Sequence, residues 1–260
     1  APSAYPRVFK SDFFALNPGG PSNLTLPGLA HVPVPRDLDA VVGNPPYVRF
    51  ENRSPEEREA VHAVLDRHYQ IDRIAYPDFT GKADLWAFFV AQVHSYLRTG
   101  GRLGFVLSWT LLCSNYGDAV VSFLARYFNV DAIIDSRVER FFAAKQHVVV
   151  LLATKAPDPP RTADGANSGH IDPAHPVRFV RLKQPLATLL NSGAARGQRA
   201  DDFVDEIMSV TGDATEDLRW DIHVAPQGRL WQRVAGAHAP EEEAPPEQDD
   251  AAEDPGEGNQ

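Results

Sequence analysis

Short apolar runs alternate with amphipathic segments along the chain from Leu38 to Thr154. The runs are short and rich in Leu, Val and Ile, as buried strands are, and they lie at 38–42, 102–108, 130–135 and 148–154. Between them, the segments 84–98 and 116–126 space their apolar residues at helical intervals. Strands that alternate with helices in this way predict an α/β fold, with a mostly parallel sheet and helices on both faces.

Local signals predict several further elements. Ser54-Pro55-Glu56-Glu57 is a capping box with proline at the first helical position, which predicts a helix from Ser54 to about Tyr69. Gly100-Gly101 follow the helix expected at 84–98 and are typical of a helix C-terminus. The remaining expected elements are strands over 8–16 and 177–182 and a short helix over 203–210.

The acidic residues are distributed unevenly. The 260 residues carry a formal charge of −10, but nine of the 35 acids lie in the last twenty positions, which hold no Lys or Arg. The rest of the chain is therefore close to neutral, and no basic stripe points to nucleic acid. Residues 240–260 are acidic, rich in Pro and free of aromatic residues, which predicts a disordered tail.

Other features exclude whole classes of site. A single cysteine, Cys113, excludes an internal disulfide framework and favours a reducing cytoplasm; because it lies in an apolar run, we expect a buried thiol. His62 and His68 are six positions apart, not the three or four that place two ligands on one helix face, so no metal site is predicted. No apolar run approaches the roughly 20 residues that span a bilayer, so we expect no membrane partner.

The loop Asn44-Pro45-Pro46-Tyr47 directly follows the strand expected at 38–42. Ligands of open α/β sheets bind beyond the carboxyl ends of strands, so a reaction centre is expected here. The amide oxygen of Asn44 and the carbonyl oxygen of Pro45 can accept both N–H bonds of a purine amine, which frees its delocalised lone pair for attack. The prolines hold these acceptors in advance, and Tyr47 offers a face for stacking. Taken alone, the tetrapeptide also fits a turn with an aromatic plug.

The segment Asp39–Arg49 closely resembles the catalytic motif of adenine-N6-specific DNA methyltransferases of restriction-modification type, which use S-adenosylmethionine. The resemblance covers roughly Val8 to Lys155 and is to the large type IIG enzymes in particular. Its other motifs follow in the family's order, at Gly81–Trp86, Gly100–Val106, Arg140–Gln146 and Val148–Lys155. It implies a Rossmann-like methyltransferase sheet, present here in part.

The resemblance also implies roles for single residues. It makes the catalytic set Asn44, Pro45, Pro46 and Tyr47, with Tyr47 and Phe142 stacking on a flipped adenine. Because Phe141 is adjacent, either phenylalanine could take the stacking position. The alternative for Phe142 is an aromatic side chain buried in the core. Asp12 is similar to the acid that hydrogen-bonds the cofactor's adenine, with Phe13 packed beside it, and an ordinary end cap is the alternative for Asp12.

One family feature is missing from the sequence. The family places a glycine-rich cofactor loop before the segment that Asp12 resembles, and residues 1–10 do not supply it. The expectation is a fragment that works with the remainder of a longer polypeptide or with a partner subunit. Residues 1–156 would then be the C-terminal part of a catalytic domain, 157–239 a linker and the start of a target-recognition or accessory region, and 240–260 the tail.

The expected function is methyl transfer from S-adenosylmethionine to N6 of a flipped adenine in double-stranded DNA, in a bacterial cytoplasm. The long insertion between Tyr47 and Asp84 and the aromatic loop at Phe141-Phe142 favour DNA as the substrate. Two alternatives stay open. The same chemistry serves a protein glutamine amide or guanine N2 in RNA, and a chain without the glycine-rich loop could be a non-catalytic remnant that binds DNA.

Overall fold

The computed structural model describes residues 11–22, 32–72, 82–136, 138, 147–157, 172–190 and 196–230. Helices and strands are mixed along the chain. They are the 3-10 helix η1 (Phe13–Ala15), β1 (Leu38–Gly43), the 3-10 helix η2 (Phe50–Asn52), α1 (Pro55–Asp72), α2 (Leu85–His94), β2 (Leu97–Ser108), the 3-10 helix η3 (Trp109–Leu112), α3 (Asn115–Tyr127), β3 (Phe128–Asp135), β4 (Val148–Lys155), β5 (Pro176–Leu182), α4 (Leu186–Leu190), α5 (Arg196–Ser209) and β6 (Trp220–Pro226).

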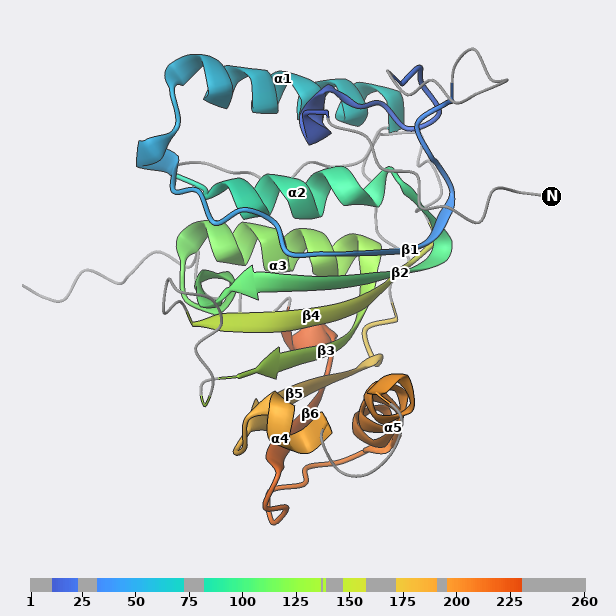
Figure 1. Ribbon diagram of the computed structural model, residues 1–260, viewed down its shortest axis with the longest axis vertical. Coiled ribbons are helices and arrows are strands. Elements are labelled where there is room, and N and C mark those ends of the chain that lie inside the picture. Colours follow the sequence, from blue (N-terminus) through green and yellow to red (C-terminus); the bar gives the residue numbers. More distant parts are fainter. Residues whose placement is uncertain are drawn as a thin grey trace, which may run out of the picture.

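The strands form one six-stranded sheet in the order β1-β2-β4-β3-β5-β6 (Figure 1). Strands β1 and β2 are parallel, as are β3 and β5, whereas β4 is antiparallel to both its neighbours and β6 is antiparallel to β5. The predicted α/β class is confirmed, but a mostly parallel sheet is wrong, since three of the five pairings are antiparallel. An apolar run such as Val148–Thr154 indicates a buried strand, but it does not indicate whether the strand runs parallel or antiparallel to its neighbours.

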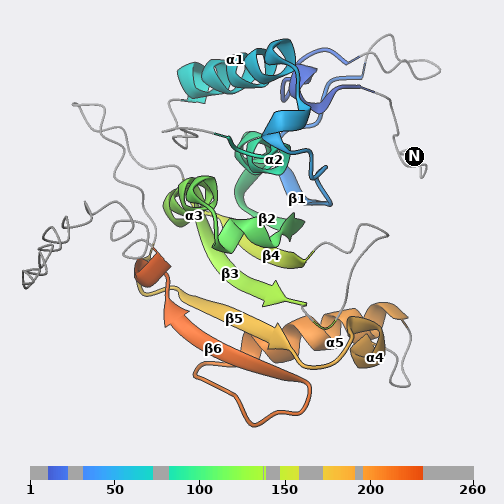
Figure 2. The same cartoon turned by 90° about the vertical axis from the view of Figure 1, so that its left-hand side faces the viewer.

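Helices cover both faces of the sheet, as predicted (Figure 2). On one face, α2 and α3 pack Phe88 and Leu124 onto a core that includes Phe105 and Leu151. On the other face, Ile207 of α5 joins a second core whose sheet residues are Ile134, Val180 and Ile222. Helix α1 packs on α2, farther from the sheet. Neighbouring residues of one strand therefore belong to different cores, because strand side chains alternate between the two faces of the sheet.

Two local predictions need correction. Helix α2 ends at His94, and Gly100-Gly101 lie inside β2 rather than at a helix end. Gly100 has a φ of +75°, and the register between β1 and β2 slips between Leu38 and Ala40, so these glycines serve an irregularity in the strand. The strand expected over 8–16 is wrong for residues 11–16, which form the η1 turn.

The capping box is confirmed. The Ser54 amide donates to Glu57 Oε2 at 2.9 Å and the Glu57 amide donates to Ser54 Oγ at 3.2 Å, which starts α1 at Pro55. Strands β5 and β6 continue the sheet beyond the boundary predicted at 157, and the functional division of the chain stays a prediction. In the part of the chain that the structure describes, no helix is long and apolar enough to cross a membrane.

Gly117 is the tightest backbone position in the junction between η3 and α3. A Cβ at this position would lie 2.7 Å from the carbonyl oxygen of Leu111 and would also clash with that of Thr110. We therefore expect Gly117→Ala to lower the free energy of unfolding by about 1–3 kcal/mol. Urea denaturation measures this, with Gly212→Ala as the control because its Cβ would meet no atom within 4 Å. Equal midpoints for the two variants would contradict the expectation.

Candidate active site

The loop Asn44–Tyr47 leaves β1 at the carboxyl edge of the parallel β1–β2 pair, where Gly43 lies opposite Phe105. Pro45 is buried, whereas Asn44 and Pro46 are exposed. The loop is thus anchored by one proline and presents the Asn44 side chain to solvent. Its position is the one at which α/β sheets bind their ligands.

The Tyr47 hydroxyl links this loop to β2. Its oxygen lies 2.6 Å from Asn44 Oδ1 and 3.0 Å from the carbonyl oxygen of Val106. The Tyr47 ring is half-buried against the core, and burial raises its pKa to about 12. The hydroxyl therefore keeps its proton at neutral pH and can donate this single proton to one of the two oxygens.

Other side chains meet at the same edge of the sheet. After β2, the Trp109 ring stacks on His147, with ring centroids 4.3 Å apart and planes 14° apart. His147 Nε2 lies 2.6 Å from Asp135 Oδ1, where β3 ends and β4 begins. The segment that carries Phe141 and Phe142 therefore departs from and returns to the edge that bears Asn44. Both phenylalanines lie outside the described residues.

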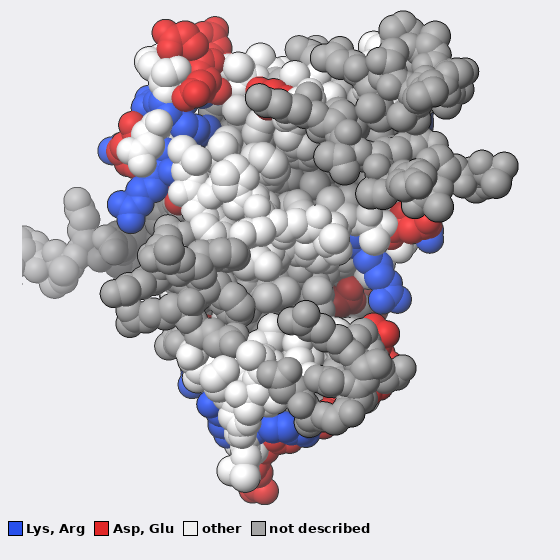
Figure 3. Space-filling model, in the orientation of Figure 1, with Lys and Arg blue, Asp and Glu red and all other residues white. Residues whose placement is uncertain are grey.

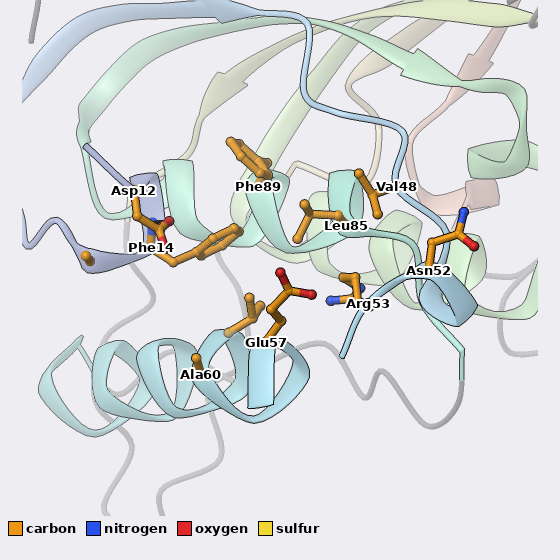
Figure 4. A pocket seen from close by; sticks show the side chains of 11 residues that line it. Asp12, Phe14, Val48, Asn52, Arg53, Glu57, Ala60, Leu85 and Phe89 are labelled. Carbon is orange, nitrogen blue, oxygen red and sulfur yellow. Dashed lines mark hydrogen bonds between the residues drawn. The ribbon is translucent and has the colours of Figure 1, made fainter. Parts of the chain in front are cut away.

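A cavity of about 420 Å³ lies between η1, α1, α2 and the segment after Tyr47 (Figure 4). Its walls are mainly apolar, with polar side chains at intervals, and its lining residues are Asp12, Phe14, Ala15, Val48, Asn52, Arg53, Glu57, Ala60, Val61, Leu85 and Phe89. A concave, mostly apolar cavity of this size with a few polar groups is typical of a small-molecule site.

Asp12 lines this cavity and also caps η1. Its Oδ1 accepts a hydrogen bond from the Phe14 amide at 3.0 Å. Asp12 is therefore an end cap, as the alternative interpretation predicts, and it lines the cavity as well. Phe13, predicted to pack beside Asp12 at the cofactor, stacks on Phe89 and Tyr96, at ring-centroid distances of 4.8 and 5.5 Å. The phenylalanines that line the cavity are Phe14 and Phe89.

Arg53 is the buried cation of this cavity. Only 5% of Arg53 is exposed, and its Nη2 donates to the carbonyl oxygen of Ala83 at 2.6 Å. The guanidinium carbon lies 5.1 Å from the ring centroid of Phe88, within cation–π range. Burial is the main cause that lowers the pKa of Arg53, and the repulsion from Arg58 adds to it. The helical pattern at 84–98 indicates that Phe89 faces inward, but nothing in the sequence indicates that Phe14, Phe89 and Arg53 share a cavity.

The remaining candidates lie elsewhere. Cys113 is exposed, so the expectation of a buried thiol is wrong. Within the described ranges, no three His, Cys, Asp or Glu side chains come together to hold a metal ion. On the face in Figure 3, Lys and Arg form small separate groups among the described residues rather than a continuous band. Among the described residues, the loop edge therefore carries the predicted set Asn44–Tyr47, and the cavity carries Asp12.

The mixed six-stranded sheet with helices on both faces belongs to the predicted α/β fold class. Among solved structures, the chain resembles the type IIG restriction endonuclease BpuSI, with a TM-score of 0.53 and 14% identity over 86% of this chain and 21% of that one. At this identity the likeness concerns the fold alone.

Sequence comparison points to one family. Residues 30–142 match the Eco57I restriction-modification methylase family. The chain is 32% identical over 103 residues to the type II methyltransferase M.XhoI of Xanthomonas vasicola, and 31% identical over 103 residues to M.PaeR7I of Pseudomonas aeruginosa. These alignments cover 40% of this chain but 17% and 16% of the two relatives. At the level of the family, this segment is similar to restriction-modification methyltransferases.

Proposed function

We propose that the protein to which this chain belongs transfers a methyl group from S-adenosylmethionine to N6 of an adenine flipped out of double-stranded DNA. The observation that carries the proposal is the placement of Asn44–Tyr47: an exposed amide and a buried proline at the carboxyl edge of β1 and β2. The family similarity of residues 30–142 supports it independently.

The Asn44 loop would activate the target amine without removing a proton first. Asn44 Oδ1 and the carbonyl oxygen of Pro45 would accept its two N–H bonds, which favours the pyramidal nitrogen whose lone pair can attack. Because β1 and Pro45 hold the loop in place, these acceptors need no reorganisation as positive charge develops on the nitrogen. Tyr47 would stack on the base, and Phe142 would supply the second aromatic face.

The cavity beside the loop fits the adenine nucleoside of the cofactor. Phe14 and Phe89 offer aromatic walls, and the Asp12 carboxylate is an acceptor for an exocyclic amine. Arg53 lies in the same lining, and among the described residues its Nε and Nη1 have no hydrogen-bond partner. Bound S-adenosylmethionine supplies the electrophilic methyl group on its sulfonium.

Part of the sheet surface is uncovered among the described residues. Val42 in β1 is 80% exposed, although it follows the half-buried Val41 in an apolar strand. Strand β1 is also the edge of the described sheet, and an unpaired strand edge is a surface that another segment can cover. We propose that further sequence, of the same polypeptide or of a partner subunit, packs here.

The proposed reaction is tested by product analysis. The chain, alone and within the longest polypeptide that encodes it, is incubated with methyl-labelled S-adenosylmethionine and double-stranded DNA, and the nucleosides are separated by mass spectrometry. We expect label in N6-methyl-2′-deoxyadenosine.

Parallel reactions with RNA and with a glutamine-containing peptide serve as controls. Label in guanine N2 or in the glutamine amide, with none in DNA, would reassign the substrate. DNA binding without label in any substrate would favour a non-catalytic protein.

A further inference from the structure

A second cavity, of about 350 Å³, lies at the carboxyl ends of β3 and β5, beside η3. Strands β3 and β5 run in the same direction as β1, because β4 is antiparallel to both β2 and β3. This cavity and Asn44 therefore share one edge of the sheet. Its lining residues Ile133 and Phe179 contact the core under α2 and α3, whereas α5 packs on the other face (Figure 2).

The second cavity is separate from the Asn44 loop. Strand β5 is four inter-strand steps from β1 in the sheet, which is about 19 Å at about 4.8 Å per step. Successive base pairs of duplex DNA are only about 3.4 Å apart along the axis. A group bound in this cavity is thus a different one from a base held at Asn44.

Trp109 lines the second cavity and is held in place before a ligand arrives. Its ring stacks on His147 with ring centroids 4.3 Å apart, and its amide donates to the carbonyl oxygen of His147 at 3.0 Å. His147 is fixed in turn, because its Nε2 lies 2.6 Å from Oδ1 of Asp135, whose side chain is largely buried. A ring fixed in this way loses little conformational freedom when a planar group packs against it.

The charged residues of the lining are balanced except at one position. Asp221 Oδ1 is paired with Lys183 Nζ at 2.7 Å, and Asp135 has His147 as its neighbour. Arg181, the cross-strand partner of Asp221, is exposed and has no ion-pair partner in the part of the chain that the structure describes. The lining therefore offers one cation, at its solvent side, to an anionic group of a ligand.

These side chains together favour a ligand with three parts. Trp109 and Phe179 offer aromatic surface to a planar ring. Thr215 and His223 offer hydrogen-bonding groups to the polar edges of such a ring. Arg181 offers its guanidinium to an anion that is attached to the ring and reaches solvent. A nucleotide has this combination, since it joins a planar base with polar edges to a phosphate.

We propose that this cavity binds one unpaired nucleotide, whose base packs against Trp109 and whose phosphate is bound by Arg181. The nucleotide must be unpaired, because a base inside a duplex is stacked between its neighbours and cannot reach the tryptophan. Its source is either a free nucleotide or an unpaired position of a nucleic acid strand. The inference does not depend on methyl transfer at Asn44.

The experiment follows the indole N–H signal of Trp109 by NMR while 2′-deoxyguanosine 5′-monophosphate is titrated into the ¹⁵N-labelled chain. The chain has four tryptophans, and the signal of Trp109 is the one that Trp109→Phe lacks. We expect a saturable shift of this signal. 2-Deoxyribose 5-phosphate, which has the phosphate but no base, should leave it nearly unchanged.

Variants test the two contacts, with the backbone amides of the cavity residues as the readout of Kd. Trp109→Leu keeps apolar bulk but removes the aromatic ring, and its Kd should rise roughly five- to a hundredfold, as for the loss of base stacking. Arg181→Met should raise the Kd about tenfold. Arg102→Met is the matched control, since Arg102 is exposed on β2 outside the cavity lining. If Trp109→Leu unfolds, Trp109→Phe, which keeps a ring, should bind more weakly than the wild type by a smaller factor.

A single-stranded oligonucleotide and the blunt duplex of the same sequence distinguish the sources. Tighter binding of the single strand than of the mononucleotide assigns the site to nucleic acid, and equal affinities per nucleotide assign it to a free nucleotide. In either case the duplex should bind this cavity more weakly than the single strand, because a base must first be extruded.

Four results overturn the inference: no shift of the Trp109 signal at millimolar nucleotide, an equal shift with 2-deoxyribose 5-phosphate, unchanged affinity in both Trp109→Leu and Arg181→Met, or equal affinity for duplex and single strand. None of these measures methyl transfer, so they leave the proposed function untouched. Conversely, the absence of label in DNA would contradict the proposed function and leave this inference intact.

Discussion

Asn44→Ala should slow methyl transfer to a small fraction of the wild-type rate while the fold and the affinity for S-adenosylhomocysteine stay unchanged: this is the largest effect that we expect. The variant removes the acceptor that the exposed side chain presents at the carboxyl edge of β1. Removing one preorganised hydrogen-bonding group of this kind costs about 10²–10³ in kcat, or about 3–4 kcal/mol. Single-turnover methylation of a DNA duplex measures the loss directly.

The control for Asn44→Ala removes the same side chain elsewhere. Asn115 is exposed at the start of α3, so Asn115→Ala should methylate DNA at the wild-type rate. Urea denaturation should give the same midpoint for wild type and Asn44→Ala, because the Asn44 side chain is exposed. Turnover by Asn44→Ala within twofold of the wild type would exclude Asn44 from the chemistry.

The sequence predicts those parts of the fold that depend on local signals. The capping box at Ser54 starts α1 as expected, and the runs at 130–135 and 148–154 are strands. Gly100-Gly101 mislead because glycine after a helix serves equally as a cap and as a strand irregularity, and only pairing with β1 decides between them. The antiparallel position of β4 between β2 and β3 is likewise a long-range property.

The two parts of the candidate site also differ in how far the sequence predicts them. The loop Asn44–Tyr47 is contiguous, so its position after a strand is visible in the sequence. The cavity joins Asp12, Arg53 and Phe89 from three separate elements, and their proximity depends on how α1 and η1 pack on α2. Arg53 lies at the end of the short helix η2, in a connecting segment where an arginine side chain is ordinarily exposed. Only the structure shows that Arg53 is 95% buried.

Tyr47 has two acceptors within reach but a single proton to donate. Its oxygen lies 2.6 Å from Asn44 Oδ1 and 3.0 Å from the carbonyl oxygen of Val106. The oxygen and nitrogen of an asparagine amide are assigned from their surroundings, and a turned amide satisfies all three groups. In that arrangement Tyr47 donates to Val106, the Asn44 nitrogen donates to Tyr47, and Asn44 Oδ1 faces away from the tyrosine.

In the proposed reaction this arrangement would leave the Asn44 oxygen available to the target amine, and Tyr47 would position Asn44 in addition to stacking on the base. We expect Tyr47→Phe, which keeps the ring, to lower kcat about two- to tenfold with an unchanged KM for DNA, as for the loss of one hydrogen bond. Tyr47→Ala also removes the stacking surface, worth about 1–3 kcal/mol, so the combined loss should reach about a hundredfold or more.

The measurement for the Tyr47 variants combines steady-state methylation with the fluorescence of 2-aminopurine at the target position, which reports base extrusion. Tyr47→Phe should flip the base like the wild type and turn over more slowly, whereas Tyr47→Ala should be deficient in both. Tyr116→Phe is the matched control, because it removes a tyrosine hydroxyl that donates to Asp84 Oδ2 at 2.9 Å rather than to Asn44. If Tyr47→Phe and Tyr116→Phe have the same kcat, the hydroxyl of Tyr47 does not orient Asn44, and stacking is the whole contribution of Tyr47.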